Sequence, residues 1–356
     1  MEQACASRLT SLNDDVLLDI CAALQETLVT EMSQTTLYIN MFPYNAALKA
    51  LSLTCKRIRV LCVPLLFDTI AIQIAWKQDT WARALARLES WDLAMAQYVR
   101  TVIITLLPGP TKESPLFPNS LPAKLADLLQ STTRLDTLTV LIAPDHASLF
   151  AAEFARRRLV FPSVRRLALG PSNEVFLPYF PDARTLTGRH TEWAASTKET
   201  SHALVRAAAR LERLECLVLR EQWDPSLMDV VQDAIPGLKI LVMAPPSTLH
   251  QDLSLETLVA HLSRFPALTI LSLPPAAVLL AGFTHPSGAE VGLHSVKRRR
   301  AEAEEHVART VFEQCAQMRE VWFGGMRRAM LGPDLLTKGG ERELVWDSKV
   351  PVWLQR

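Results

Sequence analysis

From residue 99 onward, one short pattern of apolar and polar positions recurs along the chain. An apolar residue leads, and a few alternating positions follow, as in "RLDTLTVLI" from residue 134 and "RLERLECLVLR" from residue 210. Alternation with a period of two is typical of half-buried β-strands. Eight such strands are therefore predicted, and their leading residues are Val99, Leu135, Val164, Ala183, Leu214, Leu238, Leu268 and Met318.

Segments with helical patterns stand between these strands. They cover residues 121–132, 202–212, 226–235, 255–265 and 301–318. Strands that alternate with helices favour parallel pairing through right-handed crossovers. Most strands follow one another at about 20–30 residues, which is the period of leucine-rich repeats. The sequence thus predicts an α/β fold in which residues 99–342 form an irregular leucine-rich-repeat solenoid, with parallel strands and outer helices.

Residues 9–70 precede the repeats and have a different, helical pattern. The segment "SLNDDVLLDICAAL" at 11–24 predicts a helix with Asn13 as its N-cap and two aspartates in its first turn. A second helix is predicted within 47–67, ended by Pro64. Its narrow apolar seam, at steps of three and four residues, consists of Leu48, Leu51, Cys55, Ile58 and Cys62. Residues 71–98 are expected to form a linker helix.

These two segments resemble the F-box, and the strands behind them resemble the degenerate leucine-rich repeats of many fungal F-box proteins. The matching residues are Leu12, Asp15, Val16, Leu17 and Ile20, then Leu48, Leu51, Cys55, Lys56, Arg57, Pro64, Leu65 and Phe67. Asn13 stands where the family usually has proline, and the loop between the helices is longer than usual. The family docks on the Skp adaptor of cullin–RING ubiquitin ligases. The resemblance implies a substrate receptor of an SCF-type ligase, with a Skp-type adaptor, a cullin reached through it, and a protein cargo as partners.

The resemblance also implies where the adaptor would bind. The expected docking residues are Leu12, Val16, Leu17, Ile20, Leu48, Leu51, Cys55, Ile58, Leu61, Pro64 and Leu65. Two alternatives stay open. The N-terminal segment could be the ordinary helical cap of a repeat stack, and the chain could be a leucine-rich scaffold with no ligase role.

Cargo is expected on the face of the strands that lies opposite the core leucines. The candidate contacts are Arg166, Val218, Arg220, Val242, Ile270 and Trp322. The middle of this set is unusually apolar, and there are two explanations. The stripe could be the cargo surface, or another part of the chain could cover it, as happens to strands buried on both faces. We favour a cover formed by the C-terminal tail, residues 343–356, with Trp346 and Trp353.

Composition narrows the classes of function. Apolar residues make up 49% of the 356 positions and charged residues 21%, which is enough to build a folded core. The net charge of +1 gives no overall field to hold nucleic acid or an anionic membrane. The six cysteines include no CxxC pair, which indicates reduced thiols rather than a zinc site or a disulfide framework. No nucleophile-elbow, phosphate-loop or dinucleotide motif occurs, so we predict no catalytic residue, metal or cofactor and no enzyme activity.

Three segments bear on location. The N-terminus "MEQACASRLT" lacks a basic start followed by an apolar run, so no signal peptide is expected. Residues 265–283 carry no charge, but Pro274 and Pro275 disfavour a membrane-spanning helix. The basic run Lys297–Arg300 is either a nuclear import signal or the solvated start of a helix with acidic partners. We expect a cytoplasmic or nuclear protein that binds neither membrane nor nucleic acid.

Overall fold

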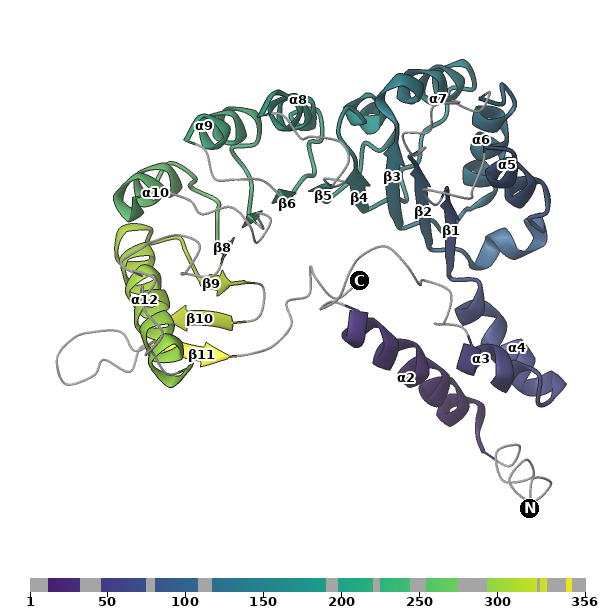
Figure 1. Cartoon of the computed structure of the whole chain (residues 1–356), viewed down its shortest axis with the longest axis horizontal. Coiled ribbons are helices and arrows are strands. Elements are labelled where there is room, and N and C mark those ends of the chain that lie inside the picture. The colour runs from purple at the N-terminus through teal and green to yellow at the C-terminus, as the bar shows by residue number, and fades with distance from the viewer. Residues whose placement is uncertain are drawn as a thin grey trace. The chain divides into compact units, whose positions relative to one another are not determined.

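A computed structural model of the chain describes residues 12–32, 46–74, 81–107, 117–189, 198–219, 225–243, 254–274, 293–324, 327–331 and 344–347. The chain divides into two compact units. Unit 1 comprises Met1–Thr139, Ala152–Leu159 and Gln355–Arg356, and unit 2 comprises Val140–Ala151 and Val160–Leu354. The boundary runs through the strand β3 (Thr137–Ile142) and the helix α7 (Pro144–Arg156). Figure 1 shows the elements of both units.

Unit 1 begins with helices and continues into a sheet. Its other elements are α2 (Asp14–Met32), α3 (Ala46–Ser52), α4 (Lys56–Leu66), β1 (Thr69–Gln73), α5 (Trp81–Glu89), the 3-10 helix η2 (Leu93–Tyr98), β2 (Thr101–Leu106) and α6 (Leu121–Ser131). The strands β1 and β2 pair in parallel, with Thr69 opposite Thr101. The helices α2, α3 and α4 pack on one another and form a helical module ahead of this sheet.

Unit 2 repeats a strand and a helix. Its elements are β4 (Arg166–Leu169), η3 (Glu174–Tyr179), β5 (Thr185–Gly188), α8 (Lys198–Ala208), β6 (Cys216–Leu219), α9 (Pro225–Ala234), β7 (Ile240–Met243), α10 (Leu255–Leu262), β8 (Ile270–Leu273), α12 (Leu293–Gln314), β9 (Glu320–Phe323), β10 (Arg327–Leu331) and β11 (Leu344–Asp347). Strands β4 to β9 pair in parallel, and β10 and β11 complete the sheet in antiparallel pairing. In each unit, the order of strands in the sheet is their order along the chain. The predicted fold class, an α/β stack of parallel strands with outer helices, is confirmed.

The strands begin where the sequence pattern places them, because each repeat starts with the same structural step. A buried apolar residue leads, and the strand starts two positions later, as Leu238 does for β7. The first strand amide then donates to the carbonyl of the residue before the neighbouring strand. Ile240 N lies 2.9 Å from Glu215 O, and Ile270 N lies 3.1 Å from Lys239 O. All eight predicted leading residues are buried: Val99, Leu135, Val164, Ala183, Leu214, Leu238, Leu268 and Met318.

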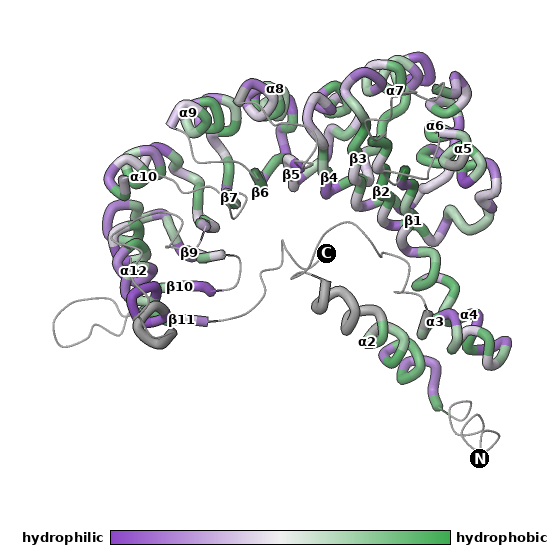
Figure 2. The backbone as a smooth tube through the Cα atoms, viewed as in Figure 1, coloured by the Kyte–Doolittle hydropathy of each residue, from purple (hydrophilic) through white to green (hydrophobic). Residues whose placement is uncertain are grey.

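One column of residues forms the core of unit 2. The second positions of neighbouring strands lie opposite one another in register. The members of this column, all fully buried, are Leu186, Leu217, Leu241, Leu271 and Val321. Figure 2 shows β6 and β7 as largely apolar. Each fully buried leucine contributes about 1.5–3 kcal/mol from the hydrophobic effect, so the repeats are stable only when they stack.

The sheet begins earlier than predicted. The strand β1 lies at Thr69–Gln73, across the expected boundary between the F-box-like module (9–70) and the linker helix (71–98). Its alternation is complete, since Ile70 and Ile72 are buried and their neighbours are not. The segment assigned to a linker helix therefore holds the end of β1, then α5 and η2. The repeat sheet starts with β1, and the prediction that it starts at residue 99 is wrong.

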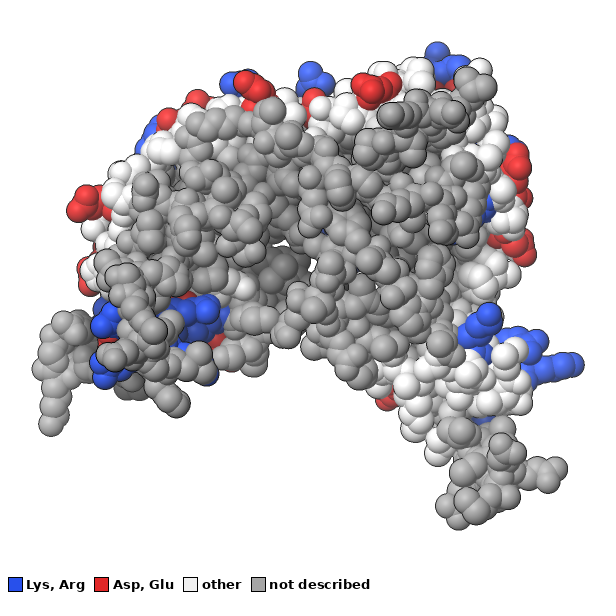
Figure 3. All heavy atoms as spheres, viewed as in Figure 1, with Lys and Arg blue, Asp and Glu red and all other residues white. Residues whose placement is uncertain are grey.

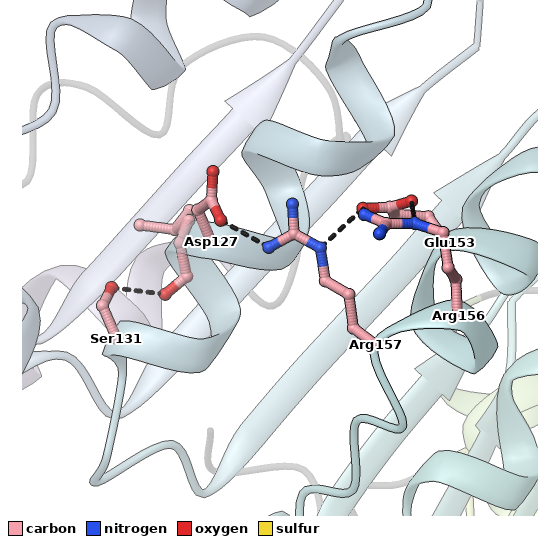
Figure 4. Close-up of polar contacts among 6 residues, drawn as sticks. Asp127, Ser131, Glu153, Arg156 and Arg157 are labelled. Atoms are coloured by element: carbon pink, nitrogen blue, oxygen red, sulfur yellow. Dashed lines mark hydrogen bonds and ion pairs between the residues drawn. The ribbon is translucent and has the colours of Figure 1, made fainter.

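An ion-pair network within unit 1 joins α6 to the C-terminal end of α7 (Figure 4). Arg157 forms an ion pair with Asp127 of α6, and its Nε lies 2.5 Å from Glu153 Oε1 on α7. Arg156 also bonds to Glu153, with Nε 2.7 Å from Oε2. Hydrogen bonds from Arg156 and Arg157 lower the pKa of Glu153 to about 2, against the opposing effect of burial. The folded state therefore prefers the ionised carboxylate.

This lowered pKa predicts a stability change in acid. A carboxylate whose pKa falls on folding stabilises the protein above its unfolded pKa, near 4.5, and this stabilisation is lost as the pH falls towards 2. Because Arg156 is mostly exposed and solvent screens it, we expect a loss of about 1 kcal/mol. Urea unfolding followed by circular dichroism at pH 5 and pH 2.5 should show a smaller pH effect in Glu153→Gln. Equal pH effects in this variant and in wild type would contradict the assignment, and Glu212→Gln, at an exposed position, is the control.

Candidate docking site on the helical module

The helical module has a closed core of its own. Five buried side chains from α2, α3 and α4 meet there: Leu17, Cys21, Leu48, Ile58 and Cys62. Partly buried residues pack around them: Leu12, Leu24, Leu51, Cys55, Leu61, Leu65 and Leu66. The F-box resemblance implied that an adaptor would contact several of these side chains. That expectation is wrong for Leu17, Leu48 and Ile58, which are at most 1% exposed, because Leu17 of α2 packs against Leu48 of α3 and Ile58 of α4 in the module's own core.

The predicted second helix is in fact two helices. It breaks at residues 53–55, where the amides of Leu53 and Thr54 donate to carbonyls three residues back instead of four, and hydroxyl groups bond to the same stretch of backbone. Ser52 Oγ donates to Lys49 O at 2.7 Å, and Thr54 Oγ1 donates to Leu51 O at 2.7 Å. Cys55 then has an extended backbone, and its Sγ accepts from the amide of Ile58 at the start of α4. The break leaves Leu53 at a turn, pointing to solvent with 65% of its surface exposed.

Pro64 does not end the second helix as predicted. It lies inside α4, which continues to Leu66, and the Phe67 amide still donates to Val63 O at 3.1 Å. A proline removes one backbone donor, and here this occurs in the last turn, where few bonds remain to be lost. The side chain of Pro64 is exposed, on the side of α4 opposite the buried residues Ile58 and Cys62.

Arg57 fixes the entry of α2 against α4. Its Nε donates to Asp14 Oδ1 at 2.8 Å, and its Nη2 donates to Leu12 O at 2.8 Å. The two basic residues at the start of α4 thus have different roles. Arg57 holds the module together, whereas Lys56 is exposed to solvent.

Several apolar side chains remain exposed once this core is closed. Val60 on α4 is 70% exposed, Val16 and Leu18 on α2 are 44% and 40% exposed, and Leu53 stands at the turn. Val60 and Pro64 are one helical turn apart and share a face of α4. We name Val16, Leu18, Leu53, Val60 and Pro64 the exposed apolar set. Its members are the candidate docking residues, of which Val60 and Pro64 share one face, whereas Val16 and Leu18 are two positions apart on α2 and face different sides of it.

The exposed apolar set overlaps only in part with the predicted docking residues. Val16 and Pro64 belong to both, whereas Leu12, Ile20, Leu51, Cys55, Leu61 and Leu65 are only half-buried. Sequence reasoning missed Leu18, Leu53 and Val60. The available signal was an apolar residue off the seam, since Val60 stands between the seam members Ile58 and Cys62 on the opposite side of the helix.

Basic residues border the candidate site. Lys49, Lys56, Arg57 and Arg59 are exposed on α3 and α4. Figure 3 shows Lys and Arg side chains gathered over these two helices. The three aspartates of α2, Asp14, Asp15 and Asp19, are also exposed, but Asp14 is paired with Arg57. The α4 side of the module is therefore positive as well as apolar.

The predicted cargo face of the sheet is mostly buried. Val218, Val242 and Trp322 are each less than a tenth exposed, so an exposed stripe is wrong for these three. Cys216, Val218 and Val242 form a separate apolar cluster with Ile240, because their strands place them side by side in register. Arg166 and Ile270 are half-buried, and Arg220 lies outside the described residues.

The described part of the C-terminal tail extends the sheet. Trp346 lies on β11 opposite Ala329 of β10, and its ring is 6.1 Å from that of Phe323. The Arg327 guanidinium lies 4.2 Å from the centroid of the same tryptophan. Residues 344–347 are thus the last strand of the sheet. The rest of the predicted cover, with Trp353, lies outside the described residues.

Other predicted features can be placed in the same way. Lys297–Arg300 are exposed on α12, where Arg298 pairs with Glu302 and Arg300 with Glu304 at helical spacing. The predicted acidic partners are confirmed for these two arginines. Across the described ranges, no group of three or more His, Cys, Asp or Glu side chains could hold a metal ion. None of the described helices is long and apolar enough to cross a membrane.

Comparisons with known proteins add little to these observations. No protein-family model matches the sequence, and no curated protein matches it. Among solved structures, the chain is similar to one in the crystal structure of a TLR13–ssRNA13 complex, with 14% identity and a TM-score of 0.29. The match covers 53% of this chain and 28% of that chain. So low a TM-score supports no shared function, and the function has to be argued from the residues themselves.

Proposed function

We propose that the chain is a substrate receptor of an SCF-type ubiquitin ligase. The helical module would dock a Skp-type adaptor, and the repeats would present a protein cargo. One observation carries the proposal: the module closes its own core and still leaves Val60 70% exposed and Leu53 65% exposed. Exposed apolar side chains favour a protein interface where they lie together, as Val60 and Pro64 do on one face of α4. The resemblance to the F-box names the partner.

The charges around the exposed apolar set favour an acidic adaptor. Lys56 and Arg59 stand on α4 beside Val60 and Pro64, so an acidic partner surface would be attracted before the apolar contacts form. The core is already folded, so docking would not require the module to fold on binding. The receptor would then act by positioning, since holding a cargo near the charged conjugating enzyme raises its effective concentration. Arg166 and Ile270 stay the proposed cargo contacts.

The alternative is a leucine-rich-repeat interaction scaffold without a ligase role. A helical cap of a repeat stack also needs a closed core, and Leu17, Leu48 and Ile58 provide one. The two functions differ in what they require of Val60 and Leu53. A cap does not need these side chains, whereas a docking site does.

Adaptor binding is expected to be lost when the exposed apolar set is made acidic. The double variant Leu53→Asp/Val60→Asp places two carboxylates on a positive, apolar surface without touching the core. We expect at least a hundredfold weaker binding, since docking would bury both side chains and the double variant replaces both. Titration calorimetry with purified Skp-type adaptor measures the change. Leu149→Asp is the matched control, because Leu149 is exposed on α7, outside the module.

Two outcomes would overturn the proposal. If folded wild type does not bind the adaptor, the scaffold function takes its place. If the double variant binds as well as wild type does, the adaptor docks elsewhere and the exposed apolar set is not the site. Circular dichroism of all three proteins shows that loss of binding is not loss of folding.

A further inference from the structure

Two cysteines meet inside the helical module. Cys21 lies on α2 and Cys62 on α4, both fully buried and both free thiols. Their Sγ atoms are 3.7 Å apart, in hydrogen-bonding contact. The residues are 41 positions apart in the sequence, so packing of α2 against α4 brings them together. The fold has therefore built a dithiol between two of the three helices of the module.

The two sulfurs are in non-bonded contact, with no other side chain between them. A disulfide has an S–S length of about 2.05 Å, so the two sulfurs would need to approach by about 1.7 Å. Leu17, Leu48 and Ile58 surround the pair with apolar groups. Burial, together with the neighbouring Cys21 thiol, raises the pKa of Cys62 to about 12. Because the thiolate is the reactive form, the oxidant reacts slowly while the module is closed. One thiol reacts with the oxidant when α2 opens, and the bond to the other thiol forms when α2 closes again.

We propose that Cys21 and Cys62 are a redox modification site, at which a peroxide or a small-molecule disulfide forms an intramolecular disulfide that locks α2 to α4. With hydrogen peroxide, the two thiols give up two electrons and two protons. The S–S bond forms, the O–O bond breaks and two water molecules leave. With oxidised glutathione, the S–S bond of glutathione breaks, and two glutathione thiols leave with the two protons.

The lock would act on the opening of α2. In the reduced module, apolar packing and the Arg57 contacts hold α2 on α4. A cross-link between helices that are distant in sequence restricts the opened states and leaves the closed state in place. Amide hydrogen exchange in α2 should then slow at least tenfold on oxidation and return to the original rate with dithiothreitol. This inference holds whether or not the module binds an adaptor.

The test uses the reduced full-length protein with hydrogen peroxide or oxidised glutathione. After digestion without reductant, mass spectrometry should find the peptides of Cys21 and Cys62 joined and two hydrogens lighter. Cys21→Ala should lose both the link and the slower exchange. Cys315→Ala should keep both, since Cys315 is a buried thiol of unit 2 and does not take part.

The wild-type result alone can overturn the proposal, so it does not depend on the variants folding. Thiols that stay reduced until the protein is denatured would contradict it. So would a link from either residue to another cysteine, a stable mixed disulfide with glutathione, or a sulfinic acid. In urea, the Cys21–Cys62 link should lose its preference over other pairings. An unchanged preference would mean that the fold does not direct the bond.

Discussion

Replacing Leu48 with aspartate is expected to unfold the helical module. Leu48 is 0% exposed and lies in the cluster of Leu17, Cys21, Ile58 and Cys62. Losing a buried leucine side chain costs about 2–5 kcal/mol, and an unpaired carboxylate in an apolar site adds several more. A module of three short helices has no such reserve. The helical circular dichroism signal should fall, and amides of α2, α3 and α4 should exchange at the rate of unfolded peptides.

Val60→Asp is the matched variant for this experiment. It introduces the same charge in the same module, at a position that is 70% exposed, and should leave the circular dichroism spectrum and the exchange rates unchanged. If Leu48→Asp keeps the protection of the module amides, the side chain is not in a closed core. If both variants unfold, the exposed apolar set is part of the fold and cannot be a docking site.

The contrast between Leu48 and Val60 shows what the helical pattern could predict. Steps of three and four residues identify which side chains share a face, and Leu48, Ile58 and Cys62 do share one. The pattern does not say what covers that face, because the cover comes from α2, more than twenty residues away across a segment of no clear periodicity. The seam also continued through the break at residues 53–55, so one helix and two helices gave the same spacing.

The strand pattern predicted more of the fold than the helical pattern did. A residue such as Leu238 must be buried at the turn before the strand, and this one requirement recurs in every repeat. Local sequence therefore fixed the strand starts. Whether Val242 is exposed depends on what packs over that face of the sheet, and the sequence of one strand does not contain this information. The strand β1 was missed because its few residues follow directly on the apolar end of α4.

Replacing both arginines that bind Glu304 is expected to lower the stability of unit 2 more than replacing Glu304 itself. Glu304 of α12 is 0% exposed, with Oε1 2.8 Å from Arg300 Nε and Oε2 2.8 Å from Arg327 Nη1. Arg300→Ala/Arg327→Ala leaves a buried carboxylate without either partner, which costs about 3–5 kcal/mol. Glu304→Gln leaves two arginines that are 45% and 36% exposed and can turn to water, which costs about 1 kcal/mol.

The size order of these effects distinguishes burial of charge from simple loss of contacts. Hydrogen exchange at the amides of α12 and β10 reports the local opening free energy of each variant. Adding Glu304→Gln to the double arginine variant should restore part of the lost stability, since the buried charge is gone. Arg298→Ala is the control, because its contact with Glu302 is on the surface and should contribute less than about 0.5 kcal/mol. If the triple variant is less stable than the double, the unpaired buried carboxylate is not what destabilises the double variant, and the loss there comes from the missing contacts of the two arginines.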